Sequence, residues 1–150
     1  IKRFGIDQTA AESGRSIYFL GRMLGTFAGA ILLTRISSGR FFMWTSVLGI
    51  ICLTAIVLVK SAALAWVLVF LIGLAVANIW PLVFSIVIGR HPDKSNEISG
   101  LVMMAISGGA VIPLLVGWVS DISNIALGMT ILIACMVYLW AVSVYCLKKL

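Results

Sequence analysis

This chain contains five long stretches that are almost free of charged residues, and these stretches constrain its fold more than any other feature. A helix rises about 1.5 Å per residue, so about 20 apolar residues cross the hydrocarbon core of a bilayer. Each stretch is at least about that long, and a single arginine, Arg22, interrupts the first. The connectors are short, so neighbouring stretches run antiparallel. We therefore predict five transmembrane helices, over residues 16–34, 41–59, 61–89, 98–120 and 122–147.

The composition favours lipid over water as the surrounding medium. Hydrophobic residues make up 62% of the 150 positions and charged residues 11%, whereas soluble domains average about 45–50% and 25%. Helices satisfy their own backbone hydrogen bonds, which is why lipid tolerates them. The expected fold class is an all-α membrane protein. The net charge of +6 is spread over the ends of the apolar stretches and not gathered on one face, so we expect no nucleic-acid partner.

The positions of the basic residues predict the orientation of the spans. One side carries three basic pairs: Arg35 and Arg40, Arg90 and Lys94, Lys148 and Lys149. Because cytoplasmic loops are rich in Lys and Arg, we assign this side and the C-terminus to the cytoplasm. The opposite side carries Lys60 and Asp121.

Residues 1–15 are expected to form a segment on the outer, periplasmic side. Lys2, Arg3 and Arg15 in this segment run against the charge rule, and an upstream helix that sets the orientation first would account for them. The chain starts at Ile1 and shows no signal-peptide pattern. Adding one upstream span gives six, the size of one half of a twelve-span facilitator. We therefore expect that an N-terminal half and one further span are missing.

Three polar features lie inside the apolar spans. Arg22 costs several kcal/mol near mid-membrane unless it faces a polar cavity or a partner. It therefore lines a water-filled pathway, or else it snorkels towards the interface or forms a structural ion pair with a residue outside this sequence. Asn78 can hydrogen-bond a sugar hydroxyl and Trp80 can stack on an apolar face, but both can equally tie helices together. Pro81 is expected to kink its helix.

Small residues suggest close helix packing at two places. Gly21, Gly25 and Gly29 form a GxxxGxxxG ladder on one helix face, where another backbone can approach. The adjacent Gly108 and Gly109 with Pro113 form a bendable segment, which would serve either close packing or a gating bend.

Enzyme chemistry has no support in the sequence. A zinc protease needs paired histidines on one helix face, and a serine hydrolase needs a base near its serine. The chain has one histidine, His91, in a loop, and no acidic residue deep in a span. Cys52, Cys135 and Cys146 lie in apolar spans without CxxC spacing, so we expect neither a disulfide nor a metal site. No cofactor is expected, which leaves transport or a membrane scaffold.

Three blocks of sequence resemble the fucose permease family of the major facilitator superfamily, whose members are proton-coupled sugar symporters. Residues 18–26, YFLGRMLGT, resemble the eighth helix of that family, and residues 78–85, NIWPLVFS, resemble the tenth. The run from residue 96 (NEISG) through residues 108–113 (GGAVIP) resembles the eleventh. The order and spacing of the blocks agree, and the bacterial glucose/galactose transporter branch is the most similar.

The resemblance implies that the chain is the C-terminal part of a twelve-helix transporter and holds helices eight to twelve. It implies symport of a monosaccharide, such as glucose, galactose or fucose, with a proton across the bacterial inner membrane by alternating access. The family's proton-carrying acids lie in its N-terminal half. Residues 34–40, with Arg35 and Arg40, resemble its basic cytoplasmic loop but lack the usual acidic residue. An exporter of drugs or metabolites with this fold, and a scaffold subunit, remain as alternatives.

Overall fold

The computed structural model describes residues 8–59 and 61–148. Within these ranges all regular structure is helical, which confirms the expected all-α fold class. The elements in chain order are α1 (Gln8–Leu33), α2 (Ser38–Leu58), α3 (Ala62–Val76), α4 (Ile79–Arg90), the short helix η1 (Pro92–Lys94), α5 (Ser95–Gly108), α6 (Val111–Ile122) and α7 (Ile125–Lys148).

Among the described residues, five helical segments are long and apolar enough to cross a membrane, as the sequence predicts, and the chain is a multi-pass membrane protein. The third segment consists of α3 and α4, and the fourth of η1, α5 and α6. The first helix starts earlier than expected, because α1 begins at Gln8 and not at residue 16. The segments are Glu12–Leu33, Ser38–Leu58, Ala62–Arg90, Pro92–Ile122 and Ile125–Tyr145.

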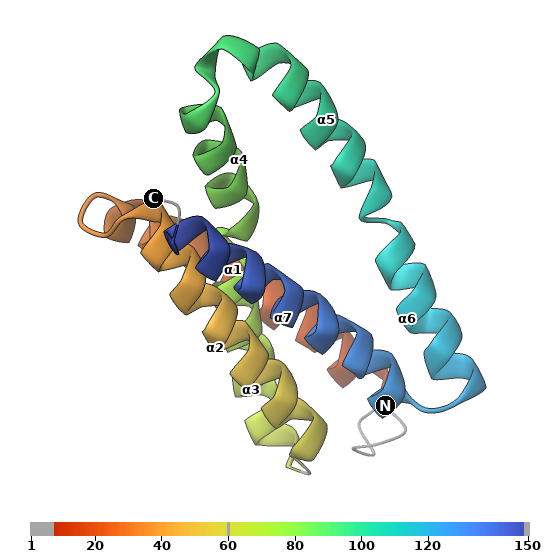
Figure 1. Ribbon diagram of the computed structural model, residues 1–150. Helices are drawn as coiled ribbons and strands as arrows, with labels where there is room; N and C mark the ends of the chain where they lie inside the picture. Colours follow the sequence, from red (N-terminus) through yellow and green to blue (C-terminus); the bar gives the residue numbers. More distant parts are fainter. Residues whose placement is uncertain (1–7, 60, 149–150) are drawn as a thin grey trace.

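The helices pack in a chain of neighbours. α1 lies against α3, α3 against α2, and α2 against α7, while α6 joins the bundle through α7. Figure 1 shows α5 and α6 as a long arm beside this bundle, connected to it through α4 at one end and α7 at the other. The buried core lies between α2, the start of α4 and α7, and consists of Phe41, Phe42, Leu53, Ile79, Leu82 and Met136.

The third and fourth spans are both interrupted four residues before a proline. α3 ends at Val76 and α4 begins at Ile79, so Ala77 and Asn78 form the break before Pro81. α5 ends at Gly108 and α6 begins at Val111, so Gly109 and Ala110 form the break before Pro113. Proline has no N–H for the carbonyl four residues earlier, and its ring clashes with that carbonyl. The helix of the third span is therefore interrupted just before Pro81, and that of the fourth span within the segment that contains Gly108, Gly109 and Pro113.

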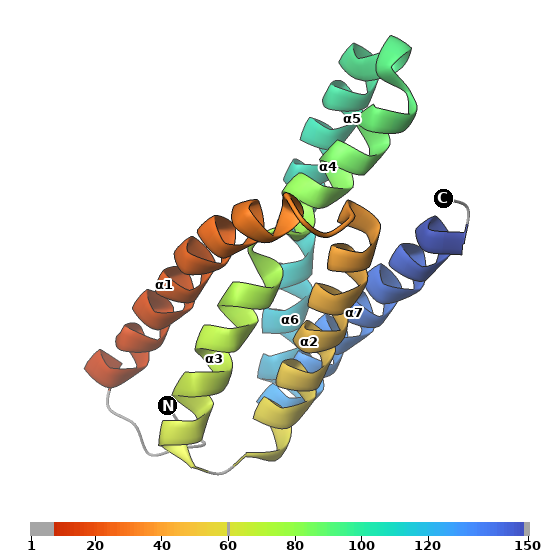
Figure 2. The same cartoon turned by 90° about the vertical axis from the view of Figure 1, so that its left-hand side faces the viewer.

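Most basic residues of the described ranges, with the exceptions of Arg15 and Arg22, gather at one end of the molecule. The α1–α2 connection, the η1 turn between α4 and α5, and the end of α7 all lie at this end in both views (Figures 1 and 2). These segments carry Arg35, Arg40, Arg90, Lys94 and Lys148, and Asp121 near the end of α6 lies at the other end. Lys2, Arg3, Lys60 and Lys149, which also entered the orientation argument, lie outside the described residues.

Candidate functional site

The glycine ladder of α1 forms the interface with α3. A side chain at Gly21 would collide with the carbonyl oxygen of Phe70, and one at Gly25 would lie 2.8 Å from the carbonyl oxygen of Leu74. Gly73 of α3 is equally tight, because a side chain there would meet the Tyr18 carbonyl of α1. The prediction of close packing is confirmed for this ladder. Its consequence is that the break at the end of α3 lies beside Gly25 and Gly29, in the C-terminal third of α1.

A cavity of about 410 Å³ opens next to this interface. Its lining comes from three helical segments: Arg22 of α1, Trp80 of α4, and Ala105, Ile106 and Gly109 at the end of α5. Two of the three residues that the sequence suggests for a substrate cavity, Arg22 and Trp80, therefore border the same space. Gly109, suggested for a gating bend, borders it as well. Ligand cavities in proteins have volumes of about 300–1,000 Å³, so this one is large enough for a small ligand.

A local feature of the sequence explains the position of each of these residues. Arg22 follows Gly21 in α1, so it lies beside the packed face of that helix. Trp80 is the second residue of α4, directly after the break, and its side chain is 39% exposed. Gly109 is the first residue of the other break. The cavity is thus bordered by the second residue after one helix interruption and by the first residue of the other.

The cavity combines a cation with an aromatic surface inside an apolar span. The guanidinium of Arg22 offers several N–H donors, and the indole of Trp80 offers a broad apolar face with one N–H. Acidic residues of the described ranges (Glu12, Asp93, Glu97 and Asp121) lie near the ends of the spans. The arrangement is suited to a ligand that presents both hydrogen-bond acceptors and apolar C–H faces.

Asn78, the third residue suggested for the substrate cavity, lies elsewhere. Its side chain is only 5% exposed, and its Nδ2 donates a hydrogen bond of 2.6 Å to the carbonyl oxygen of Gly25 in α1. It borders a separate cavity of about 190 Å³ with Gly25, Gly29 and Leu74 among its neighbours. The structure therefore shows the inter-helix amide bond that the sequence left as the alternative to sugar contact.

The residues suggested for bending have different surroundings from those of the glycine ladder. A side chain at Gly108 would meet no atom of the described residues within 4 Å, and one at Gly109 would approach the carbonyl of Ile106 in its own helix. Pro81 and Pro113 are both exposed. Close packing against another helix, one of the two interpretations of this segment, is thus not observed at Gly108 or Gly109 among the described residues.

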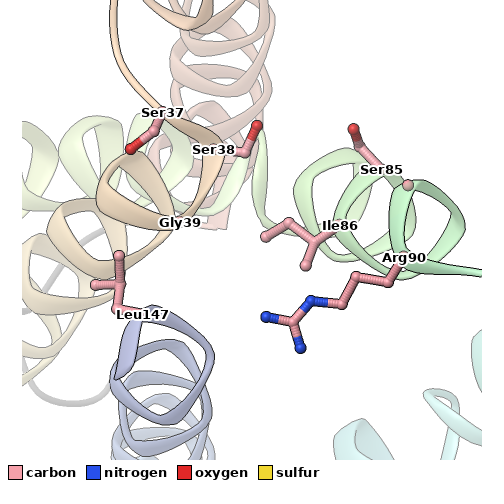
Figure 3. Close-up of a pocket in the computed structure, with 8 residues that line it drawn as sticks. Ser37, Ser38, Gly39, Ser85, Ile86, Arg90 and Leu147 are labelled. Atoms are coloured by element: carbon pink, nitrogen blue, oxygen red, sulfur yellow. The ribbon is translucent and has the colours of Figure 1, made fainter. Parts of the chain in front are cut away.

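The basic loop lies at the end of the bundle, apart from the Arg22 cavity. Arg35 is exposed in the turn after α1, and Nε of Arg40 donates a hydrogen bond of 3.0 Å to Oγ of Ser37. A cavity of about 380 Å³ lies here between the start of α2 and the ends of α4 and α7. Figure 3 shows the Arg90 side chain extending from α4 towards Leu147 at the end of α7. This second cavity borders the loops, whereas the Arg22 cavity lies inside the spans.

Sequence reasoning missed Ala105 and Ile106 as lining residues, because apolar residues of a membrane helix look the same whether they face lipid or a cavity. It also missed the contact between Gly29 and Asn78, where a side chain at Gly29 would collide with the amide. Within residues 8–59 and 61–148, no group of three or more His, Cys, Asp or Glu residues could hold a metal ion.

Comparison with known proteins finds bacterial sugar transporters. The chain is 28% identical over 135 residues to a glucose/galactose transporter of Brucella abortus, which covers 90% of this chain and 32% of the relative. It is 25% identical over 120 residues to a putative glucose/galactose transporter of Helicobacter pylori, covering 80% of this chain and 29% of the relative. It is 29% identical over 132 residues to the glucose/mannose transporter GlcP of Bacillus subtilis, and this match covers 86% of this chain and 32% of the relative.

No family model matches the chain. No solved structure matches it either. The chain spans about a third of the length of the curated relatives, although the similarity extends over most of this chain. The resemblance to sugar transporters of the major facilitator superfamily, with the glucose/galactose transporters among the relatives, is therefore confirmed.

Proposed function

We propose that this chain is part of a secondary transporter that carries a monosaccharide, such as glucose, galactose or fucose, together with a proton. The observation that carries the proposal is the cavity that Arg22 and Trp80 both line within the membrane spans. The similarity to glucose/galactose and glucose/mannose transporters supports the sugar as the substrate class. The proposal applies to a full-length protein that contains this chain.

The chemistry of the cavity suits a sugar. A pyranose ring has hydroxyl groups around its edge and C–H groups on its faces. The Arg22 guanidinium would donate hydrogen bonds to the hydroxyl oxygens, and the Trp80 indole would pack against a C–H face. A guanidinium inside the membrane is costly unless it faces a polar ligand, water or a partner, so a sugar-filled or water-filled cavity also accounts for the presence of Arg22.

The two helix breaks supply a basis for alternating access. Trp80 directly follows the break before Pro81, and Gly109 belongs to the break before Pro113. Bending at these breaks would move α4, η1 and α5 relative to the rest of the bundle and so open or close one side of the cavity. Pro81, Gly108, Gly109 and Pro113 are the gating residues of this proposal.

The proposed cellular setting is the inner membrane of a bacterium, in contact with lipid. The basic end of the bundle, with Arg35, Arg40 and the C-terminal end of α7, would face the cytoplasm. The proton would be carried by acidic residues of the N-terminal half expected for the full-length protein. Sugar, proton, lipid and that N-terminal half are thus the proposed partners.

Uptake by the purified full-length protein in proteoliposomes tests the function. Vesicles would receive radiolabelled glucose, galactose, fucose or mannose, with and without an inward proton gradient. We expect at least one sugar to accumulate above its external concentration when the gradient is present. A protonophore should abolish this accumulation, and protein-free vesicles serve as the control.

Each other outcome rejects a part of the proposal. Sugar entry that reaches the external concentration but does not depend on the gradient would retain sugar transport and reject proton coupling. If protein shown to be folded and inserted transports none of the tested sugars, the transport proposal is rejected. An exporter of other compounds or a scaffold would then be favoured.

A further inference from the structure

We infer that Asn78 is a positioning residue, which holds Trp80 opposite Arg22 by tying the break in the third span to the backbone of α1. The inference rests on the proposed function of the Arg22–Trp80 cavity, and it assigns to Asn78 a role other than sugar contact. Asn78 acts through Trp80, two residues further along the chain.

The first observation is the hydrogen bond itself. The Nδ2 atom of Asn78 lies 2.6 Å from the carbonyl oxygen of Gly25, and the side chain is 5% exposed. Other buried polar side chains behave differently: the hydroxyls of Thr45, Ser46 and Ser143 donate to carbonyls of their own helices. Asn78 instead joins two spans, at the point where the third span loses its helical continuity.

The second observation is the space that Gly29 leaves for the amide. The three atoms nearest to a side chain built at Gly29 are Nδ2, Cγ and Oδ1 of Asn78, and the nearest would collide with it. Glycine at this position therefore lets the amide reach the carbonyl of Gly25, one turn earlier on the same face of α1. The ladder thus has two functions, since Gly21 and Gly25 accommodate the α3 backbone while Gly29 accommodates the Asn78 amide.

The third observation is the location of the bond relative to the cavity. Asn78 immediately precedes α4, whose second residue is Trp80, and Gly25 lies three residues beyond Arg22 in α1. The bond therefore fixes the start of α4 to the part of α1 that carries Arg22. A helix break without such an anchor would leave the direction of α4, and with it the Trp80 indole, free to vary relative to Arg22.

Two substitutions break the bond from opposite sides. Asn78→Ala removes the donor, and Gly29→Ala displaces the amide without changing Asn78. In the full-length protein in proteoliposomes, we expect each to raise the KM for sugar about three- to tenfold, the range for a hydrogen bond between membrane helices. The maximal rate should remain close to that of the unaltered protein. The double variant should be no worse than the more severe single one, because the shortened side chain at position 78 no longer collides with a methyl group at position 29.

A fluorescence measurement reports on Trp80 directly. Every other tryptophan of the full-length protein is replaced by phenylalanine, including Trp44, Trp66, Trp118 and Trp140 of this chain. The emission spectrum of Trp80 without sugar should shift in both single variants, because the indole leaves its place beside Arg22. Asn96→Ala and Gly100→Ala are the matched controls, since Asn96 is exposed and a side chain at Gly100 would meet nothing within 4 Å.

The outcomes separate this inference from the proposed function. If the unaltered protein transports sugar and neither substitution changes KM, Asn78 does not position Trp80, while the transport proposal stands. If the unaltered protein transports no sugar, the transport proposal fails, and an unshifted Trp80 spectrum in both variants would also reject the positioning role. If neither variant folds, the bond is a requirement of folding, and the inference is overturned. Multiplicative effects on KM in the double variant would overturn it too.

Discussion

Arg22 and Trp80 contribute different properties to one cavity. Arg22 brings a permanent charge and several donors, and Trp80 brings a large, rigid apolar face. A guanidinium surrounded only by hydrocarbon is costly, so Arg22 depends on a polar ligand, water or a partner in the cavity. At the scale of single residues, the proposed binding chemistry therefore depends on a pair that combines a cation and an indole.

Removing the charge of Arg22 is the sharpest single-residue test. Arg22→Gln retains donors but loses the positive charge and the forked geometry. Hydrogen bonds to charged groups contribute about 1.5–3 kcal/mol, so we expect the ratio of maximal rate to KM to fall about 10- to 100-fold. Uptake kinetics in proteoliposomes measure this. Arg15→Gln, at an exposed position earlier in α1, is the control, and equal effects of the two substitutions would contradict a role for Arg22 in the cavity.

At the scale of helices, the interface of α1 with α3 determines how the cavity is assembled. Lipid tails are as favourable a surrounding for apolar side chains as another helix is. Helices in membranes therefore associate through close packing and hydrogen bonds. The glycines of α1 allow this packing, and Asn78 adds the hydrogen bond at the end of α3. The interface places the end of α3, and thus the start of α4, beside the residues that follow Arg22.

Adding one methyl group to this interface should destabilise the protein. In Gly21→Ala, the new carbon would collide with the backbone carbonyl of Phe70, which cannot rotate away as a side chain does. Overpacking of this kind costs about 1–3 kcal/mol, so the melting temperature in detergent should fall. Gly117→Ala adds the same group where no described atom lies within 4 Å and should leave the melting temperature unchanged. Similar melting temperatures for the two variants would argue against this interface.

In the proposed transport mechanism, the prolines of the broken spans allow the helices to bend. Pro81 is the third residue of α4, where its missing N–H removes no bond within α4 but leaves the Ala77 carbonyl without that donor. Pro81→Ala restores the donor and should favour a continuous helix. We expect a lower maximal transport rate with a smaller change in KM, because bending and not binding is affected. An unchanged rate in uptake assays would show that bending at this break does not limit transport.

At the scale of the whole molecule, the chain has an apolar exterior and one basic end. Exposed apolar side chains such as Met104 and Leu114 cover the arm formed by α5 and α6, which suits contact with lipid tails or with other apolar helices. The basic residues at one end predict which side of the membrane that end faces. Five antiparallel spans then place the η1 turn and the α6–α7 turn on opposite sides.

Labelling of single cysteines tests this topology in the full-length protein. In a background where every cysteine of the full-length protein is replaced by alanine, Cys52, Cys135 and Cys146 among them, Lys94→Cys and Asp121→Cys each introduce one thiol at an exposed position. A membrane-impermeant maleimide should label the Asp121→Cys variant in intact spheroplasts. It should label the Lys94→Cys variant only after the membrane is permeabilised. The reverse pattern would invert the proposed orientation. Labelling of both variants in intact spheroplasts would contradict an odd number of membrane crossings between positions 94 and 121.

The sequence by itself determined the spans and their interruptions. Apolar length is enough to predict a membrane helix, because lipid leaves the backbone no partner but its own helix. The breaks before Pro81 and Pro113 were predictable for a similar reason, since proline removes a donor wherever it lies within a helix. The glycine ladder of α1 was also readable as a packing face, because residues four apart lie on one side of a helix.

Only the tertiary structure decided which polar residues share a cavity. Asn78 and Trp80 are two residues apart, yet one hydrogen-bonds to α1 and the other borders the cavity with Arg22. The Asn78 bond joins residues 53 positions apart in the chain, and no local pattern encodes that pairing. The physical reason is that the direction of a side chain around its helix is meaningful only once the neighbouring helices are in place, and those positions follow from packing over the whole bundle.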